Sequence, residues 1–578
     1  MRLGRMRRIA PLALASLAFV FAGVPALAQT QLDINNANQQ AQRLIQEQQQ
    51  REQQRIQELE RRQRRPSGED LTTQPAPPAD AAAPGRCFDI RQVVLDGATL
   101  LSAEDREKLT RPLIGRCVGL PEINDLIQAI TNHYITRGYA TTRAYIPEQD
   151  MTTGTLHLLV LEGLVEKIML DGSGLSIGTA FPRQVGQIFN LREFEQGLDQ
   201  INRLRSNNAT MDIAPGDAPG ASVIKIDNTP AKRWILNLAN DNTGSQATGW
   251  FQTSATLGVD DLAGLNDYLN LSFRENPNPL PDQRLSRSLS ALYTVPYGRW
   301  LFSLSASDFK FVSLTQGQVA QFQSSGTART SNLHFDRMMY RDQSTKLTLS
   351  GGLTFKDNIN YLNGATINNS SRKLNVADVG ANLSLNALGA LWSFDLGRQQ
   401  GLSAYGALRD PGGLAVAAPR AQFTKYTYGA NVSLPMKFGA QAVTYQTTLT
   451  GQYSPDVLYG TEQLTIGGPF SVRGYRTAFI SGDSGLYARN ELGVPFALSK
   501  VLGASAPKGE IKPFVAYDVG HISDKYGVPG GSLSSVTVGF ALAISTVSLQ
   551  FSQSVPEHRP SRLTGIGPYT YVRIAIDI

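Results

Sequence analysis

The sequence predicts a membrane all-β fold: a transmembrane β-barrel of 16 antiparallel strands, preceded by two small α+β modules and an N-terminal helix. Three observations predict it. The first residues have the pattern of an export signal. Residues 86–230 contain two rounds of a strand–helix–helix–strand–strand (βααββ) pattern. From 231 to the end, apolar and polar residues alternate in about 16 segments, as in membrane barrels.

The composition excludes several protein classes. The 578 residues include 54 Lys and Arg against 48 Asp and Glu, a net charge of +6. This small excess is dispersed, whereas nucleic-acid binding needs clustered basic residues. Two Cys exclude a disulfide-dense scaffold, and five scattered His leave little room for a His-rich metal site. We therefore expect no nucleic-acid partner, no metal and no cofactor.

Residues 1–28 have the features of a cleaved secretory signal. Four Arg precede an apolar run from Ile9 to about Val24, and a small-x-small exit ends at Ala28. An uncleaved membrane anchor is the alternative, but the polar segment that follows favours cleavage. Export also favours a disulfide between Cys87 and Cys117, because such bonds persist in oxidising compartments. A metal site at these two Cys is the weaker alternative, since no further ligand lies at suitable spacing.

Two polar segments follow the signal. Residues 29–65 are rich in Gln, Arg and Glu, with a thin apolar stripe at roughly helical spacing. They predict either a solvated helix or a polar helix that lies in a polar cavity. Residues 66–85 are rich in Pro and Ala, which is typical of an extended linker.

Two modules are expected next, at 86–163 and 164–230. In the first we expect strands at 87–95, 141–146 and 155–162, and helices at 102–110 and 120–137. The apolar stripe of the second helix and Gly138 after it support that helix most strongly. In the second module we expect strands at 165–170, 209–213 and 222–228, with helical segments at 183–188 and 191–204.

The barrel is predicted over residues 231–578. A soluble β-sandwich or propeller is disfavoured, because the second face of each strand is small or polar and no blade repeat occurs. The long charge-free stretch from Val536 to Phe551 alternates with period two. Its apolar phase slips at Ser545 and Thr546, which predicts a hairpin turn rather than a membrane-spanning helix.

The most informative motif is Val472-Arg473-Gly474-Tyr475, in a long Gly-rich connection between two strands. Downstream, an alternating strand contains Phe514, Asp518 and Gly520. If its apolar residues face lipid, Asp518 faces the lumen. A connection folded into the lumen could then bring Arg473 to Asp518 as a bidentate ion pair, although a surface role for Arg473 is the simpler alternative.

Together these features resemble the outer-membrane transporters of two-partner secretion, the haemolysin-activator and filamentous-haemagglutinin-transporter family within the POTRA-plus-barrel superfamily. The stretch from Ile123 to Asp150 also resembles that family's first POTRA module. The resemblance implies a bacterial outer-membrane pore with periplasmic POTRA modules that exports a large secreted exoprotein (TpsA-type). It implies that the helix plugs the pore at rest, that Val472–Tyr475 folds into the lumen, and that Arg473 and Asp518 are the family's motif residues.

The resemblance also implies partners and binding residues. Outer-membrane lipid surrounds the barrel, the barrel-assembly machinery inserts it, and the protein works as a monomer. Ile578 departs from the C-terminal aromatic residue usual in such barrels. In the first module, an exposed strand edge beside the long helix could pair with an extended partner. The candidate residues there are Thr141, Arg143, Tyr145, Asn132 and Arg137.

Other functions were weighed. A barrel-assembly or lipid-handling factor would carry more POTRA modules, and a passive porin would not need them. Gly482-Asp483-Ser484-Gly485 matches a serine-protease signature, but no His lies in a recognisable base motif, so we expect a turn and no enzyme. With no nucleotide site recognisable in the sequence, we expect the folding of the exported protein outside the cell to supply the free energy.

Overall fold

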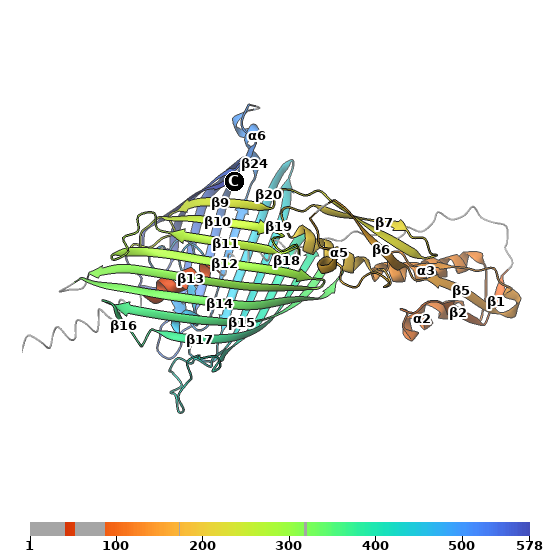
Figure 1. Cartoon of the computed structure of the whole chain (residues 1–578), viewed down its shortest axis with the longest axis horizontal. Coiled ribbons are helices and arrows are strands. Elements are labelled where there is room, and N and C mark those ends of the chain that lie inside the picture. Colours follow the sequence, from red (N-terminus) through yellow and green to blue (C-terminus); the bar gives the residue numbers. More distant parts are fainter. Residues whose placement is uncertain (1–40, 53–86, 173, 317–320, 504) are drawn as a thin grey trace, which may run out of the picture.

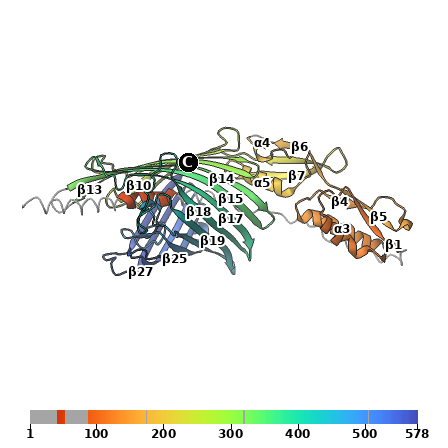
Figure 2. The same ribbon diagram turned by 90° about the horizontal axis from the view of Figure 1, so that it is seen from below.

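The computed structural model describes residues 41–52, 87–172, 174–316, 321–503 and 505–578. The predicted signal (1–28) and linker (66–85) lie outside these residues, as do both ends of the predicted polar helix. Two small modules lie one after the other, outward from one end of a large barrel. The helix at 41–52 lies within the barrel (Figure 1; Figure 2). Among the described residues no helix is long and apolar enough to span a membrane.

We call the first module POTRA 1 and the second POTRA 2, after the modules that the sequence resembles. POTRA 1 has a three-stranded sheet in the order β2-β5-β4, with β2 and β5 parallel and β4 antiparallel to β5. A separate pair, β1 and β3, lies beside it. The elements are β1 (Phe88–Ile90), β2 (Gln92–Asp96), α2 (Ala103–Thr110), η1 (Arg111–Leu113), β3 (Arg116–Val118), α3 (Leu120–Thr136), β4 (Arg143–Tyr145), η2 (Met151–Thr153) and β5 (Thr155–Leu161).

The long helix α3 buries the stripe that predicted it. Ile123, Leu126, Ile130 and Tyr134 are all buried in the core of POTRA 1. Gly138 follows in the left-handed conformation, with φ at 95°, which ends the helix at low steric cost.

Three predicted details of POTRA 1 are wrong. The strand predicted at 87–95 is divided into β1 and β2, and β3 was not predicted. The strand predicted at 141–146 is only three residues long. The Thr142 amide donates to the Tyr139 carbonyl, so Thr141 lies in a turn rather than in β4.

The second module, POTRA 2, has the sheet order β6-β8-β7 with one core of its own. Its elements are β6 (Leu164–Asp171), α4 (Ile177–Ala180), α5 (Leu191–Asn202), β7 (Ala209–Pro215) and β8 (Ala221–Asn228). The helix predicted at 183–188 is absent from the described residues, and α4 lies before it. Arg183 and Gly186 both have positive φ, 60° and 82°, which interrupts a right-handed helix.

The barrel is closed and antiparallel, and among the described residues sixteen long strands form its wall. The long strands are β9 (Trp234–Asp241), β10 (Gln252–Asp260), β11 (Tyr268–Glu275), β12 (Arg284–Tyr297), β13 (Trp300–Gln316), β14 (Gln321–Arg341), β15 (Thr345–Leu362), β17 (Arg372–Ala387), β18 (Ala390–Leu402), β19 (Thr424–Phe438), β20 (Gln441–Tyr453), β23 (Gly485–Gly493), β25 (Gly509–Ile522), β26 (Gly531–Ile544), β27 (Val547–His558) and β28 (Tyr569–Asp577). The short strands β16 (Ala365–Thr366) and β24 (Phe496–Ala497) pair antiparallel with the ends of β15 and β25. β28 pairs with β9 and closes the cylinder, so no strand edge is left open to lipid.

The alternating side chains of the barrel strands face the sides that the sequence predicted, with apolar residues outward and polar residues inward. On β25, Val515, Tyr517 and Val519 are exposed on the outside, whereas Phe514 and Asp518 are buried on the inside. The predicted hairpin is confirmed: Ile544 pairs with Val547 across Ser545, which has φ at 51°. Successive turns alternate between the two ends of the barrel. The turns that follow β10, β12 and β14 contact POTRA 2, so the connection from β20 to β23 leaves the opposite end.

Candidate functional site: the lumen and the first POTRA module

The connection between β20 and β23, residues 454–484, folds back against the inner wall; we call it the lumenal loop. Its short strands β21 (Leu464–Ile466) and β22 (Ile480–Gly482) pair with each other. A cluster of buried apolar side chains joins the loop to β23, β25 and β26: Ile466, Val472, Tyr475, Ile480, Tyr487, Ile522 and Leu533. The loop is therefore packed like a core segment, not like a surface loop.

Arg473 and Asp518 form the ion pair that the sequence predicted. Arg473 Nε donates to Asp518 Oδ2 at 2.7 Å, and its Nη2 donates to Oδ1 at 2.8 Å. The backbone amide of Arg473 adds a third bond to Oδ2 at 3.0 Å. Asp518 is fully buried. Such a pair fixes the position of the loop tip on β25 through both geometry and charge.

A further acid at this site was not predicted. Arg473 Nη1 donates to Glu491 Oε2 at 3.1 Å, and Glu491 lies on β23, beside β25. Glu491 lies on the strand that follows the loop. However, nothing in the sequence distinguished it from other inward-facing polar residues.

The rest of the motif fits closely against the wall. Val472 is fully buried, and a side chain at Gly520 would meet Val472 Cγ2 at 3.2 Å. A side chain at Gly474 would meet Ser535 Cβ at 2.8 Å. Small residues at both positions thus let the loop lie directly on the strands. Tyr475 donates through its hydroxyl to the carbonyls of Ser534 at 3.1 Å and His558 at 2.5 Å.

The predicted partner Phe514 lies on the same inner face of β25, four residues from Asp518. It is buried, and a side chain at Gly539 of β26 would meet its Cζ at 2.8 Å. Phe514 therefore packs on the neighbouring strand of the wall.

The helix at 41–52 binds the lumenal loop through its polar face. Arg43 donates to the carbonyls of Arg476 and Thr477, both at 2.8 Å. Gln50 Nε2 donates to the Thr465 carbonyl at 2.9 Å, and Gln46 donates to the Gly460 carbonyl. The wall contributes fewer bonds, such as that from Gln48 to Ser288 at 2.8 Å.

The apolar face of this helix packs on two Phe that interrupt the polar lining. Phe309 and Phe311 on β13 point inward and contact Ala41, Leu44 and Ile45. In the sequence, these Phe break the rule that apolar residues of β13 face outward. This break in alternation is the signal in the sequence that marks where the helix packs.

A cavity of about 510 Å³ remains between this helix and the inner wall. Ser, Thr, Asn and Gln predominate among its polar lining residues, and charge comes from Glu52, Asp336, Lys356, Asp378, Asp395, Lys425 and Glu462. A lining of this kind suits a hydrated polypeptide.

The strand of POTRA 1 that we expect to bind a partner, β4, has a free edge in its sheet but is only three residues long. β4 is an outer strand of its sheet, and α3 packs beside it. Tyr145 is half exposed, whereas Arg143 donates to the carbonyls of Ala140 and Thr142 at 2.7 and 2.8 Å. The Ala144 amide already donates to Thr131 Oγ1 on α3 at 3.3 Å. A partner strand that used this amide would have to displace that bond.

The other candidates are spread over the module. Asn132 lies on α3, half-buried. Arg137 ends α3, and its Nη2 donates to Asp105 on α2 at 3.0 Å. Thr141 packs against the connection to POTRA 2, where a side chain at Gly163 would meet its Oγ1 at 2.0 Å. Arg137 and Thr141 are thus held by structural contacts inside this chain.

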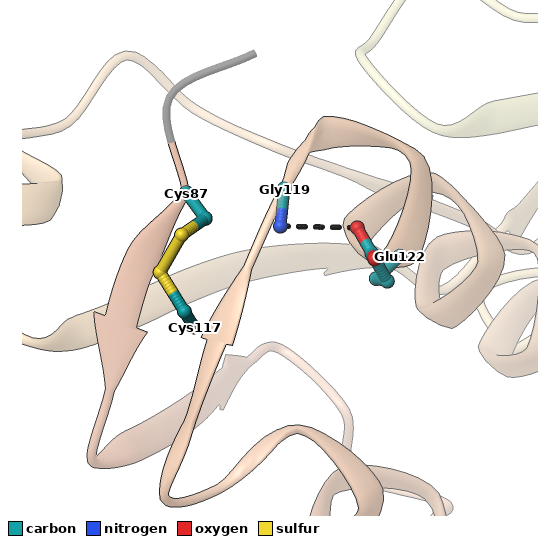
Figure 3. Close-up of a disulfide and its surroundings, with 4 residues drawn as sticks. All are labelled: Cys87, Cys117, Gly119 and Glu122. Carbon is teal, nitrogen blue, oxygen red and sulfur yellow. Dashed lines mark hydrogen bonds between the residues drawn. A yellow bond between two sulfur atoms is a disulfide. The ribbon is translucent and has the colours of Figure 1, made fainter. Parts of the chain in front are cut away.

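Cys87 and Cys117 form a disulfide that joins β1 to β3, with the Cα atoms 5.2 Å apart (Figure 3). Next to it, Glu122 accepts a bond from the Gly119 amide at 3.0 Å at the start of α3. The disulfide therefore holds the strand that leads directly into the helix beside β4.

The protease-like sequence lies at the base of the lumenal loop. The Ser484 hydroxyl accepts a bond from the Ser454 amide at 3.0 Å, and Asp483 accepts one from the Leu458 amide at 3.0 Å. These bonds hold the two ends of the loop together. Within the described ranges, no group of three or more His, Cys, Asp or Glu side chains could hold a metal ion.

Comparison with known families gives matches over both halves of the chain. Residues 220–542 match the family described as haemolysin secretion/activation protein ShlB/FhaC/HecB. Residues 88–163 match the ShlB-type POTRA domain, and residues 164–215 match a POTRA domain.

Individual relatives agree with these matches. The outer membrane transporter CdiB of Dickeya dadantii is 34% identical over 86% of this chain and 87% of its own length. The hemolysin transporter protein ShlB of Serratia marcescens is 34% identical over 78% of each chain. The structure of CdiB from Escherichia coli is similar with a TM-score of 0.84 and 31% identity, covering 93% of this chain and 98% of that one. This chain therefore belongs to the ShlB/FhaC/HecB family of haemolysin secretion/activation proteins, the outer-membrane transporters of two-partner secretion systems.

Proposed function

We propose that the barrel is the channel through which one large exoprotein, of the haemolysin or adhesin type, leaves the periplasm. The observation that carries this proposal is the lumenal loop, which Arg473 and Asp518 hold inside a barrel whose lining is polar. A passive porin has no need of the two POTRA domains that precede this barrel. The folding of the exported chain outside the cell would supply the free energy.

The helix at 41–52 closes the channel at rest in this proposal. It forms hydrogen bonds to the loop on one face and packs on Phe309 and Phe311 on the other. The bonds from Gln46 and Gln50 join neutral groups and contribute about 1 kcal/mol each, whereas those from the charged Arg43 contribute about 1.5–3 kcal/mol each. The helix can therefore be displaced without unfolding the barrel.

POTRA 1 receives the N-terminal secretion domain of the exoprotein in this proposal. An extended segment would add to β4, with side chains against Tyr145 and Asn132. The chain works as one copy, because its barrel closes on itself, and the barrel-assembly machinery inserts it into the outer membrane.

Export is tested by expressing this chain with the large, β-repeat-rich exoprotein encoded beside its gene. The exoprotein should reach the medium only when the chain is present. The variant Arg473→Ala should abolish export, because it leaves Asp518 buried without its partner. Barrel abundance and heat-modifiable migration must equal those of the parent; normal export at equal abundance contradicts the proposal.

The POTRA 1 contact is tested by binding of the purified N-terminal secretion domain to the full-length chain in detergent. Tyr145→Ala should weaken binding at least about fivefold, because it removes an exposed aromatic contact. Ile114→Ala is the matched control, since Ile114 is also exposed in this module but lies outside β4 and α3. If both variants lose the same binding affinity, the secretion domain does not bind at the edge of β4.

A further inference from the structure

The lumenal loop has a second ionic contact with the wall, away from Asp518. Glu462 ends the single-turn helix η3 (Gly460–Glu462) near the start of the loop. Its Oε1 accepts a bond from Lys356 Nζ at 2.6 Å, and its Oε2 accepts one from Lys425 Nζ at 2.9 Å. Lys356 lies on β15 and Lys425 on β19, with β17 and β18 between them. One carboxylate thus spans four adjacent strands of the wall.

The backbone of Glu462 is held as well. Its carbonyl accepts bonds from Lys425 Nζ at 3.1 Å and from Gln452 Nε2 at 3.0 Å. The Glu462 side chain has no exposure to solvent, and those of Lys356 and Lys425 have 12% and 8%. Buried charges of this kind are tolerated only when paired, so loss of the carboxylate leaves the two ammonium groups uncompensated.

Glu462 lies between two acceptors that bind the N-terminal helix. The Gly460 carbonyl accepts a bond from Gln46, and the Thr465 carbonyl accepts one from Gln50. The Gln46 side-chain oxygen also accepts a bond from Thr465 Oγ1 at 3.3 Å. The position of Glu462 therefore determines where these helix-binding groups lie.

We propose that Glu462, paired with Lys356 and Lys425, is a positioning residue for closure of the channel. It holds the start of the lumenal loop against β15 and β19, while Arg473 holds the tip against β25. Loss of the Glu462 contact releases the surface that binds the helix at 41–52 but leaves the Arg473–Asp518 pair in place. This inference rests on the proposed role of that helix in closing the channel.

The experiment measures single-channel conductance of the purified full-length chain in planar lipid bilayers. Glu462→Gln should increase the fraction of time in the open state at least about tenfold. The neutral amide has one acceptor oxygen, so one lysine loses its partner and the bond to the other lysine loses the acceptor's charge. Asp308→Asn is the matched control, because the Asp308–Arg329 pair also lies on the barrel but is exposed. It should leave the open fraction unchanged.

A triple variant, Lys356→Met, Lys425→Met and Glu462→Gln, separates positioning from charge strain, because it leaves no buried lysine uncompensated. A raised open fraction in this variant as well supports the proposal. A return to the parent value, or no effect of Glu462→Gln alone, overturns it. Deletion of residues 41–52 tests closure by the helix separately from the role of Glu462. If this deletion also leaves conductance unchanged, closure by the helix is wrong. Export through the barrel is a separate claim, which the secretion experiment tests. Heat-modifiable migration reports folding of each variant.

Discussion

Arg341, at the end of β14, donates through Nε to Glu195 Oε2 of helix α5 at 3.2 Å, and its side chain is 1% exposed. The same guanidinium contacts Asp199, one turn further along α5, and Lys346 lies 3.6 Å from that carboxylate. Arg299, in another turn at this end of the barrel, pairs with Glu193. Acidic side chains of α5 thus dock POTRA 2 onto a basic rim of the barrel.

The first prediction concerns this docking. Arg341→Ala removes the buried guanidinium that Glu195 and Asp199 share, and leaves Glu195 with Arg192 and Asp199 with Lys346. Removal of one member of a buried pair costs up to about 3–5 kcal/mol. We expect hydrogen–deuterium exchange in α5 to become much faster in the full-length chain, whereas exchange in the barrel strands is unchanged. Arg287→Ala, which breaks the half-exposed pair with Glu275, should leave α5 unaffected. Unchanged exchange in α5 would show that the apolar contacts alone hold POTRA 2.

The second prediction concerns the shape of the Arg473 side chain. Arg473→Lys keeps the positive charge but loses the planar fork that makes parallel bonds to both oxygens of Asp518. We expect export to fall at least about tenfold at normal barrel abundance. Arg329→Lys is the matched control, because that Arg is exposed and pairs with Asp308 on the neighbouring strand β13. Full export by Arg473→Lys would mean that charge alone suffices.

The third prediction concerns the disulfide. Cys87 and Cys117 are 30 residues apart, and closing a loop of that length contributes about 3–4 kcal/mol in the chain-entropy description. Replacing both Cys by Ser should therefore accelerate hydrogen exchange throughout the POTRA 1 core. Reductant should have the same effect on the parent chain and none on the double variant. Parent and variant with equal protection would contradict the prediction.

The fourth prediction concerns the pH dependence of POTRA 1. Burial lowers the pKa of His133 below its ordinary value, with Arg137 as the next cause, although Asp105 acts in the opposite direction. The folded module thus binds this proton more weakly than the unfolded chain. Its contribution to stability is full above the unfolded pKa, near 6.5, and decreases as the pH falls through that value toward the folded pKa.

The measurement is exchange in α3 of the full-length chain between pH 7.5 and 5.5, corrected for the intrinsic rate at each pH. Protection should decrease toward pH 5.5 in the parent, and this decrease should be smaller in His133→Gln. The Asp105 carboxyl does not interfere, because the Ser102 hydroxyl and Arg137 lower its pKa, so that it stays charged throughout this range. An identical decrease in parent and variant would assign the pH effect to other groups.

The outward face of the barrel could be predicted residue by residue. Side chains on a strand alternate with period two, and lipid accepts only apolar ones, so the sequence of β25 was sufficient to direct Val515 outward and Asp518 inward. The turn at Ser545 followed from the same rule, because a slip of one residue would place polar side chains in lipid. Helix α3 was equally predictable, since its apolar stripe has a single period over four turns.

Local errors occurred where short segments depend on their neighbours. The three-residue strand β4 and the four-residue helix α4 are too short to have a period, and their bounds are set by turns at Gly138 and by packing under α5. The inward direction of Phe309 and Phe311 was not predicted, because the alternation rule assigns apolar side chains to the lipid-facing side alone. Their burial depends on a helix more than 250 residues earlier in the chain.

The sequence by itself determined the class of this protein. Its alternation specifies a lipid-facing wall, and the motif at 472–475 together with Asp518 specifies one contact between the loop and the inner face of that wall. Only the tertiary structure decided which charges meet inside. The Glu462 carboxylate lies between lysines from β15 and β19, and the α5 acids lie on basic barrel turns, because closing the cylinder brings together residues far apart in the chain. The period-two alternation of the sequence reveals that a polar residue faces inward. The identity of its partner depends on how the strands are arranged around the lumen.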